Sequence, residues 1–295
     1  MQRSDFDTAH DYAEWARRSG LDYVDRQARP RGCGGASGSL AFACVPVRKP
    51  KPLRQSRYLT GREFWKAYRG VALANLNGEV LASMLTISWG SVGLSGAAAW
   101  AAHQGFIELF RKWRQARGMS QSWFWVRERG SKLGDHSHIV MQLDWEFELE
   151  LHRWAERAFE TVTEQPALRV NRSRLLQTVH LRSQRMRLED QLARQWAFFQ
   201  YLFKGLPMDE AVAVPGLIRG SMPAANLISR SLRSQGLVIG KRSGLSKALG
   251  PSAIADFMAE YPLAFPARGR RGEVAYDDRF LFRGETERRL QRLKI

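Results

Sequence analysis

The sequence predicts an α+β fold in which helices flank a central antiparallel sheet. Residues 122–128 alternate as a strand does, and a short turn rich in Gly, Ser and Lys leads to a second, apolar strand at residues 136–143. Residues 80–89 form another apolar run of strand type. Apolar side chains at helical spacing over residues 61–74 and 95–116 predict one helix before this run and one after it. Strands with helices on both sides favour a sheet covered by helices.

Helical segments are also expected after the hairpin. Asp144 can cap a helix that runs to about residue 161, because its carboxylate can accept a hydrogen bond from the first turn. A loop containing Pro166 follows. Residues 174–203 form a long basic segment of helical pattern, and Gly205 and Pro207 behind it are typical stop residues.

The chain divides into three predicted parts. Residues 1–56 are rich in Gly, Pro and basic side chains, which favours an N-terminal basic arm or a solvated linker. Residues 57–206 carry the globular pattern and the candidate site. Residues 207–295 are broken by prolines and glycines, and we expect a mostly helical C-terminal extension there, with DNA binding as one role.

The charge of the chain points to a polyanionic partner. Lys and Arg total 46 against 29 Asp and Glu, which gives a net charge of +17 and a pI near 10.6. Such an excess favours a nucleic acid or an anionic membrane as partner, although a merely basic soluble protein is the alternative. Cys33 and Cys44 form no CxxC pair, so the sequence argues against a zinc finger.

A membrane location is not expected. Residues 80–107 contain no Asp, Glu, Lys or Arg, and that length could cross a bilayer. Serines and glycines interrupt the run, however, so a buried strand, a turn and a buried helix account for it better. The N-terminal residues lack the apolar core of a signal peptide, and we therefore expect a cytoplasmic protein.

His136 and His138 are candidate metal ligands. They lie two residues apart at the start of an apolar strand, so both imidazoles project from one face. Glu128, near the end of the preceding strand, can complete the ligand set across the hairpin. Such a site leaves open positions for a phosphate oxygen and water. The alternative is that the histidines are structural, as isolated strand histidines usually are.

Tyr201 and Lys204 are candidate catalytic residues. They lie three residues apart in the segment WAFFQYLFKG, hence on one face of the predicted helix. A tyrosine hydroxyl titrates near pH 10 and is a poor nucleophile alone, but a neighbouring ammonium favours the phenolate. The alternative is an amphipathic helix with an ordinary tyrosine and a surface lysine.

The order of these features resembles the three motifs of HUH endonucleases, in particular rolling-circle replication initiators. The resemblance covers about residues 80–205. The matching positions, motif by motif, are Leu85, Thr86 and Ile87, then His136, Ser137 and His138 with Glu128 as the acidic ligand, then Tyr201 and Lys204. Two positions depart from the pattern: Ser137 replaces a bulky apolar residue, and the third motif carries a single tyrosine.

The resemblance implies a fold and an activity. The fold would be a palm of the HUH or RRM-like type, with the histidines at the centre of the sheet and the tyrosine helix packed nearby. The activity would be nicking of single-stranded or hairpin origin DNA with Mg²⁺ or Mn²⁺, leaving a 5′-phosphotyrosine and a free 3′ hydroxyl. Rolling-circle replication would add a host helicase or polymerase as partners.

Several residues are expected to contact DNA. Trp65, Trp123 and Trp125 could stack on bases, or could simply belong to the core. Residues 236–253 resemble, more loosely, a downstream stretch of plasmid and phage replication proteins. The candidate polar contacts are Thr86, Arg127, Arg129, Lys241 and Arg242.

The sequence leaves three other functions open. A single-tyrosine transposase or a relaxase of the same superfamily is the first, although relaxases carry the tyrosine before the histidines. The second is a noncatalytic DNA-binding protein, with a helical DNA-binding unit over residues 224–247. The third is a membrane-associated basic protein, which rests on residues 80–107 alone.

Overall fold

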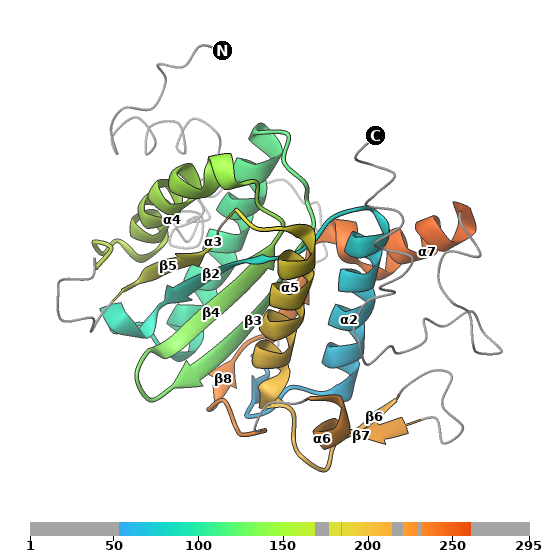
Figure 1. The fold of residues 1–295 in the computed structure, drawn as a ribbon. Helices are drawn as coiled ribbons and strands as arrows, with labels where there is room; N and C mark the ends of the chain where they lie inside the picture. The colour runs from blue at the N-terminus through green and yellow to red at the C-terminus, as the bar shows by residue number, and fades with distance from the viewer. Residues whose placement is uncertain (1–52, 169–176, 184, 214–220, 229–231, 261–295) are drawn as a thin grey trace, which may run out of the picture. The chain divides into compact units, whose positions relative to one another are not determined.

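A computed structural model describes residues 53–168, 177–183, 185–213, 221–228 and 232–260 (Figure 1). Almost all of the predicted N-terminal arm, including both cysteines, lies outside these residues. The helices and strands carry the labels of Figure 1.

A five-stranded antiparallel sheet with strand order β5-β2-β4-β3-β9 forms the centre of the described chain. Its strands are β2 (Ser83–Ser88), β3 (Trp123–Gly130), β4 (Gly134–Met141), β5 (Val179–Arg182) and β9 (Ser243–Leu245). The middle strand β4 pairs with β2 on one side and with β3 on the other. The predicted α+β class with a central antiparallel sheet is therefore confirmed.

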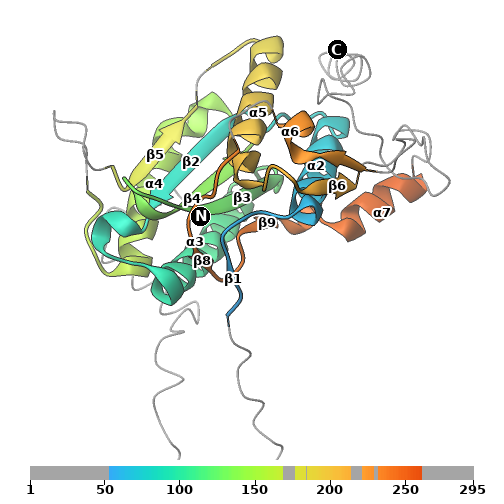
Figure 2. The same ribbon diagram turned by 90° about the horizontal axis from the view of Figure 1, so that it is seen from below.

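Helices cover both faces of this sheet (Figures 1 and 2). One face packs against α2 (Gly61–Leu76) and α5 (Leu188–Leu202), and the other against α3 (Gly96–Ala116) and α4 (Glu148–Thr163). The 3-10 turns are η2 (Gly90–Val92), η3 (Trp145–Phe147), η4 (Phe203–Gly205) and η5 (Lys247–Leu249). The other elements are β1 (Gln55–Ser56), β6 (Ala211–Ala213), β7 (Ser221–Pro223), α6 (Ala224–Leu227), β8 (Val238–Ile239) and α7 (Pro251–Glu260).

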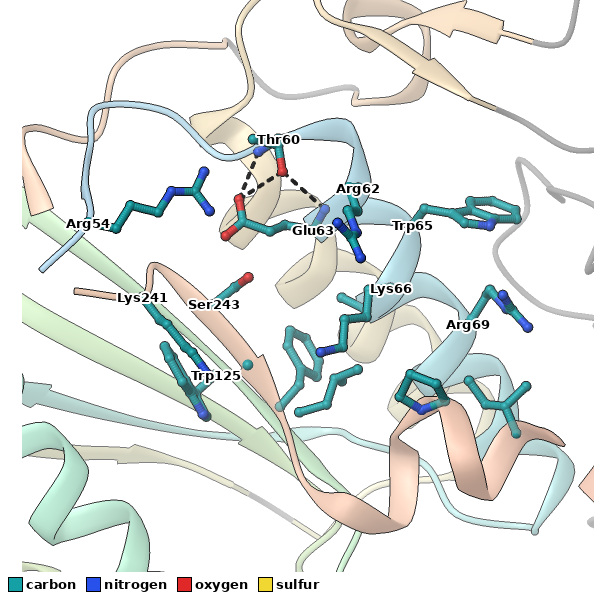
Figure 3. Close-up of a pocket in the computed structure, with 16 residues that line it drawn as sticks. Arg54, Thr60, Arg62, Glu63, Trp65, Lys66, Arg69, Trp125, Lys241 and Ser243 are labelled. Carbon is teal, nitrogen blue, oxygen red and sulfur yellow. Dashed lines mark hydrogen bonds between the residues drawn. The ribbon is translucent and has the colours of Figure 1, made fainter. Parts of the chain in front are cut away.

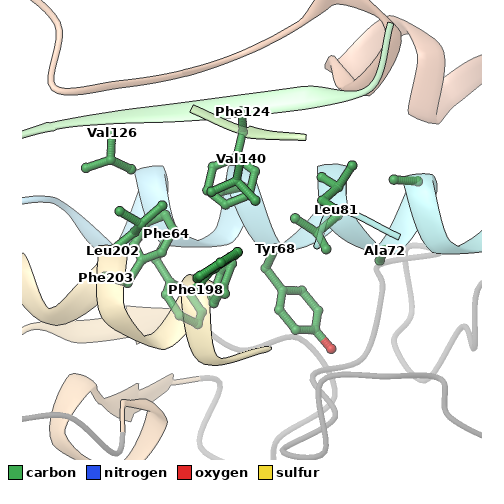
Figure 4. Packing of buried hydrophobic residues seen from close by; sticks show 14 of the residues in the cluster. Phe64, Tyr68, Ala72, Leu81, Phe124, Val126, Val140, Phe198, Leu202 and Phe203 are labelled. Atoms are coloured by element: carbon green, nitrogen blue, oxygen red, sulfur yellow. The ribbon is translucent and has the colours of Figure 1, made fainter. Parts of the chain in front are cut away.

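The core between the sheet and the α2–α5 pair is rich in phenylalanine (Figure 4). Phe64 of α2 meets Phe199 and Phe203 with ring centroids 5.4 Å apart in both cases, each in an edge-to-face arrangement. The sheet contributes Phe124 and Val126, both buried. Each such side chain stabilises the fold by about 1.5–3 kcal/mol through burial. This packing fixes the position of α5 over β3 and β4.

Tryptophans dominate the opposite face. Trp123 packs edge-to-face on Phe110 of α3, and Trp125 meets His103 of the same helix at 4.4 Å between ring centroids. Both indoles are buried. Of the two roles considered for these tryptophans, burial supports the core role for Trp123 and Trp125. Trp65 is only partly buried and stacks on Tyr68.

The predicted long helix over residues 174–203 is wrong in its first part. Residues 179–182 instead form β5, an edge strand paired with β2, and α5 begins only at Leu188. Val179 is buried while His180 and Arg182 are exposed, which is the period-two pattern of a strand. The pattern is only four residues long, and the basic residues around it hide it in the sequence.

The C-terminal part completes the sheet rather than standing beside it. β9 pairs with β3, and β8 pairs with β1. The described residues, from 53 onward, lie in one compact unit, without a structural boundary at 206/207. The expected helical unit over residues 224–247 is also wrong: the described residues there form the four-residue helix α6 and the strands β8 and β9.

Candidate metal centre and nucleophile

The β3–β4 hairpin brings Glu128, His136 and His138 together. Glu128 stands directly opposite His136 in the register, and His138 follows two residues later on the same face. The carboxylate Oε2 lies 3.5 Å from Nε2 of His136 and 4.0 Å from Nε2 of His138. One potential ligand atom from each residue lies within 4.8 Å of the others, and all three side chains are buried. This cluster could hold a metal ion.

Hydrogen bonds behind the imidazoles orient both rings. Nδ1 of His136 lies 2.9 Å from the carbonyl oxygen of Gly134, and because a carbonyl only accepts, Nδ1 carries the proton there. Nδ1 of His138 lies 2.8 Å from Oγ1 of Thr86 on β2. In both rings the other nitrogen, Nε2, faces the carboxylate. Metal-bound histidines usually have a second hydrogen bond of this kind.

His138 provides the clearest sign that the cluster suits a cation. Its Nε2 atom is buried and has no hydrogen-bond partner among the described residues. Burial, helped by the charge of His136, lowers the pKa of His138 to about 3, so the ring is neutral at neutral pH. A neutral imidazole with a free lone pair beside an ionised carboxylate matches the donor set of divalent metals. The residues present therefore fit a metal ion.

Lys204 contacts the carboxylate directly. Its Nζ lies 2.8 Å from Oε1 and 3.0 Å from Oε2 of Glu128, and it comes from the η4 turn that follows α5. Burial alone would raise the pKa of Glu128. The hydrogen bond to His136 and the nearby His138 and Lys204 outweigh it, and the pKa is lowered to about 2. Glu128 is thus ionised over the whole physiological range.

Tyr201 lies beside the cluster, in contact with His138 and Lys204. Its side chain, 38% exposed, lies edge-on to His138 with ring centroids 5.6 Å apart. The Lys204 ammonium sits 3.4 Å from the centroid of the phenol ring. Burial and the Glu128 charge raise the pKa of Tyr201, against the opposing effect of Arg233 and Arg182. The phenol is therefore protonated at neutral pH in the state without substrate.

The expected DNA contacts fall into two groups. Arg129 and Lys241 are exposed, whereas Arg127 and Arg242 are buried. Arg127 donates to the carbonyl oxygen of Ile239, and Arg242 donates to those of Ser56 and Gly236. Burial and these hydrogen bonds argue against DNA contact by Arg127 and Arg242, because both guanidinium groups tie the C-terminal segment to the rest of the chain.

Two supporting residues have structural roles that the sequence does not reveal. Thr86 is predicted to contact DNA, but its hydroxyl bonds His138 across the β2–β4 pair. Gly134 supplies the carbonyl for His136 and has a positive φ of 60°. The only sequence signal for the role of Thr86 is the strand motif in which it lies. The only signal for the role of Gly134 is that it is a glycine in the predicted turn.

No family model, curated protein or solved structure matches this chain. Within the described residues, the helices are too short or too polar to cross a membrane.

Proposed function

We propose that this protein is a metal-dependent DNA-nicking enzyme of the HUH type that initiates rolling-circle replication. The observation that carries the proposal is the meeting of Tyr201 and Lys204 with the buried Glu128, His136 and His138 cluster. The two groups of residues come from segments far apart in the sequence, so their meeting is not a consequence of local spacing.

The metal would be held by Glu128, His136 and His138. Mg²⁺ or Mn²⁺ bound there would supply positive charge to the scissile phosphate and make phosphorus more electrophilic. Thr86 and Gly134 would hold the imidazoles in the ligating orientation. Metal binding would also place a second cation on the carboxylate that Lys204 now contacts, which would free the ammonium to contact a phosphate oxygen.

Tyr201 would act as the nucleophile. Its phenol oxygen would form a bond to phosphorus while the bond from phosphorus to the 3′ oxygen breaks. The phenol proton would end on the departing 3′ oxygen, giving a 5′-phosphotyrosine and a 3′ hydroxyl. Because one phosphodiester replaces another, the 3′ hydroxyl can reverse the step and rejoin the strand. Because burial and the Glu128 charge raise the pKa of Tyr201, the phenol would keep its proton until the nucleophilic step.

A covalent-adduct assay tests this proposal. The protein is incubated with Mn²⁺ and labelled single strands or hairpins, and the adduct is detected after denaturing electrophoresis. Tyr201→Phe is expected to abolish the adduct, because phenylalanine lacks the attacking oxygen. Tyr58→Phe serves as the matched control, since Tyr58 is also partly exposed and lies outside the cluster. Adduct formation by Tyr201→Phe at the wild-type level would contradict the assignment.

The Glu128–Lys204 ion pair supports a second candidate, a noncatalytic DNA-binding protein. This pair already neutralises the buried carboxylate without any metal. A protein of this kind would bind DNA but would show neither Mn²⁺ binding nor an adduct.

A further inference from the structure

A second cationic feature lies at the β9 edge of the sheet. It is a cavity of about 700 Å³ between α2, β9 and the start of α7, and we call it the α2–β9 groove (Figure 3). This volume lies in the range of ligand-binding clefts. Its charged lining residues are Arg54, Arg62, Lys66, Arg69 and Lys241, with Glu63 as the single acid. None of the residues of the metal centre lines it.

Cations stand on both walls of the α2–β9 groove. Arg62, Lys66 and Arg69 follow one another at helical spacing on α2, so they share one face over about 10 Å. Arg54 and Lys241 come from the opposite wall, next to β1 and β9. Figure 3 shows Lys66 and Lys241 extending from the two walls into the space between them.

Within the described part of the chain, none of these five cations forms an ion pair. On α3, by contrast, Arg111 and Lys112 both pair with Glu108. Oε2 of Glu63 accepts hydrogen bonds from the backbone N–H and the hydroxyl of Thr60, which leaves this one carboxylate facing five cations. Nε of Arg69 is buried and has no hydrogen-bond partner among the residues that the structure describes.

This arrangement works against the stability of the protein. Like charges on one helix face repel each other, although Glu63 in the first turn of α2 offsets the unfavourable effect of Arg62 on the helix dipole. An anionic ligand in the groove would relieve the repulsion among the cations. The concave shape suits a narrow chain of negative charges rather than a flat lipid surface.

We propose that the α2–β9 groove binds the phosphate backbone of a nucleic acid, as a second contact apart from the metal centre. Successive phosphates would face the two rows of cations. Phe124 in the groove and Glu128 in the metal centre lie on the same strand, separated by about 13 Å of β3. A single nucleic-acid strand could therefore contact both the groove and the candidate metal cluster. The choice of a nucleic acid rests on the proposed function, whereas the anion site rests on the groove alone.

Salt-dependent binding tests the proposal with matched variants of the full chain. Arg62→Ala/Lys66→Ala removes two cations at i, i+4 on α2, and Arg153→Ala/Arg157→Ala removes two exposed cations at the same spacing on α4. Fluorescence anisotropy with a labelled single strand, in EDTA so that no cleavage occurs, gives the affinity at several KCl concentrations. The groove variant, Arg62→Ala/Lys66→Ala, is expected to bind about tenfold more weakly. The slope of log K against log salt should become shallower by about 1.4.

Three results would overturn the proposal. They are an unchanged affinity in the groove variant, an equal loss in the α4 control, and competition by polyglutamate as effective as that by an unlabelled oligonucleotide at equal charge.

The outcomes distinguish failure of the nicking proposal from failure of the groove proposal. If only the nicking proposal is wrong, no adduct forms but groove-dependent binding persists. If only the groove proposal is wrong, the adduct forms and the groove variant binds like the wild type.

Discussion

At the scale of single residues, the contacts of Ser137 explain why a serine stands where the HUH pattern has a bulky apolar residue. It lies between the two candidate ligands His136 and His138 but faces the opposite side of the sheet. Its hydroxyl accepts a hydrogen bond from Nε1 of Trp89 at 2.7 Å and lies 3.0 Å from Nδ1 of His103. A bulky apolar residue would leave the buried indole N–H unpaired, which costs about 1–3 kcal/mol. The serine therefore belongs to the polar core behind the site.

The imidazole of His138 is expected to be required for metal binding. His138→Ala should weaken Mn²⁺ binding by at least about tenfold, because even changes to residues behind a ligand cost roughly 10–100-fold. Thr86→Val, which removes only the supporting hydroxyl, should weaken Mn²⁺ binding by roughly 10–100-fold. Titration calorimetry at neutral pH measures both.

The control for this measurement is His152→Ala. His152 lies on α4 and pairs with Glu156 at 3.7 Å, so its loss should leave Mn²⁺ affinity unchanged. A wild-type protein that binds no Mn²⁺ would contradict the metal centre and favour the noncatalytic candidate.

At the scale of elements, the junction between α5 and η4 sets the position of both candidate catalytic side chains. Tyr201 lies in the last turn of α5, and Lys204 lies in the tighter η4 turn behind it. Phe199 and Phe203, both buried, hold this junction against α2. The phenylalanines thus keep Lys204 in contact with β3.

The start of β4 is expected to require glycine. A Cβ on Gly134 would lie 2.9 Å from Cα of Gly90, and its φ of 60° is in the left-handed region. Gly134→Ala should lower the free energy of unfolding by more than the roughly 1–2 kcal/mol that left-handed backbone alone costs. It should also weaken Mn²⁺ binding, since the Gly134 carbonyl orients His136.

Gly118→Ala is the matched control for Gly134→Ala. Gly118 also has a positive φ, 64°, but its Cβ would meet nothing within 4 Å. Gly118→Ala should therefore lower the free energy of unfolding only by the cost of left-handed backbone, and it should leave Mn²⁺ affinity unchanged. Equal effects of the two substitutions on denaturation and on metal titration would refute the close approach of Gly134 to Gly90 as the cause.

At the scale of the whole molecule, the two candidate sites lie at different parts of one sheet. The metal centre lies on the β3–β4 hairpin, and the α2–β9 groove lies at the edge formed by β9. A net charge of +17 attracts nucleic acid in general, whereas the groove concentrates unpaired cations around a cavity. The general charge should raise the association rate, and the groove should set the affinity.

Global stability is expected to fall with acid because the pKa values of His103 and His138 are both lowered in the folded protein, and His103 is the one of the two that lies outside the candidate metal cluster. Burial, then the Arg127 charge, lowers the pKa of His103 well below 6.5, so the folded protein keeps the ring neutral. The unfolded chain takes up a proton below about pH 6.5, hence the stabilisation is full above that pH and is lost as the pH falls below it. The slope from this group approaches about 1.4 kcal/mol per pH unit.

Denaturant titrations in EDTA between neutral pH and mildly acidic pH measure this slope. His103→Gln should be less stable at neutral pH, because the contacts with Trp100 and Trp125 are lost, but its stability should depend less on pH. Identical slopes for the variant and the wild type would show that His103 is not the group responsible.

Local periodicity accounts for the features that could be predicted before the structure. Residues two apart on a strand share a face, and a short turn places two strands side by side, so the sequence suffices to group Glu128, His136 and His138. A spacing of three residues likewise indicates that Tyr201 and Lys204 share one side of their segment, although the structure places Lys204 in the η4 turn behind α5. The α+β class follows from the order of these patterns along the chain.

Tertiary structure alone decided which distant segments meet. β5 is hidden in the sequence because four alternating residues carry too little periodicity against a basic background, and only pairing with β2 makes them a strand. Arg127 and Arg242 look like surface cations in the sequence, but both are buried and donate to backbone carbonyl oxygens, Arg127 to Ile239 of β8 and Arg242 to Ser56 of β1 and to Gly236. The contact of Lys204 with Glu128 spans 76 residues. Such contacts are fixed by packing of the core, which periodicity along the chain does not encode.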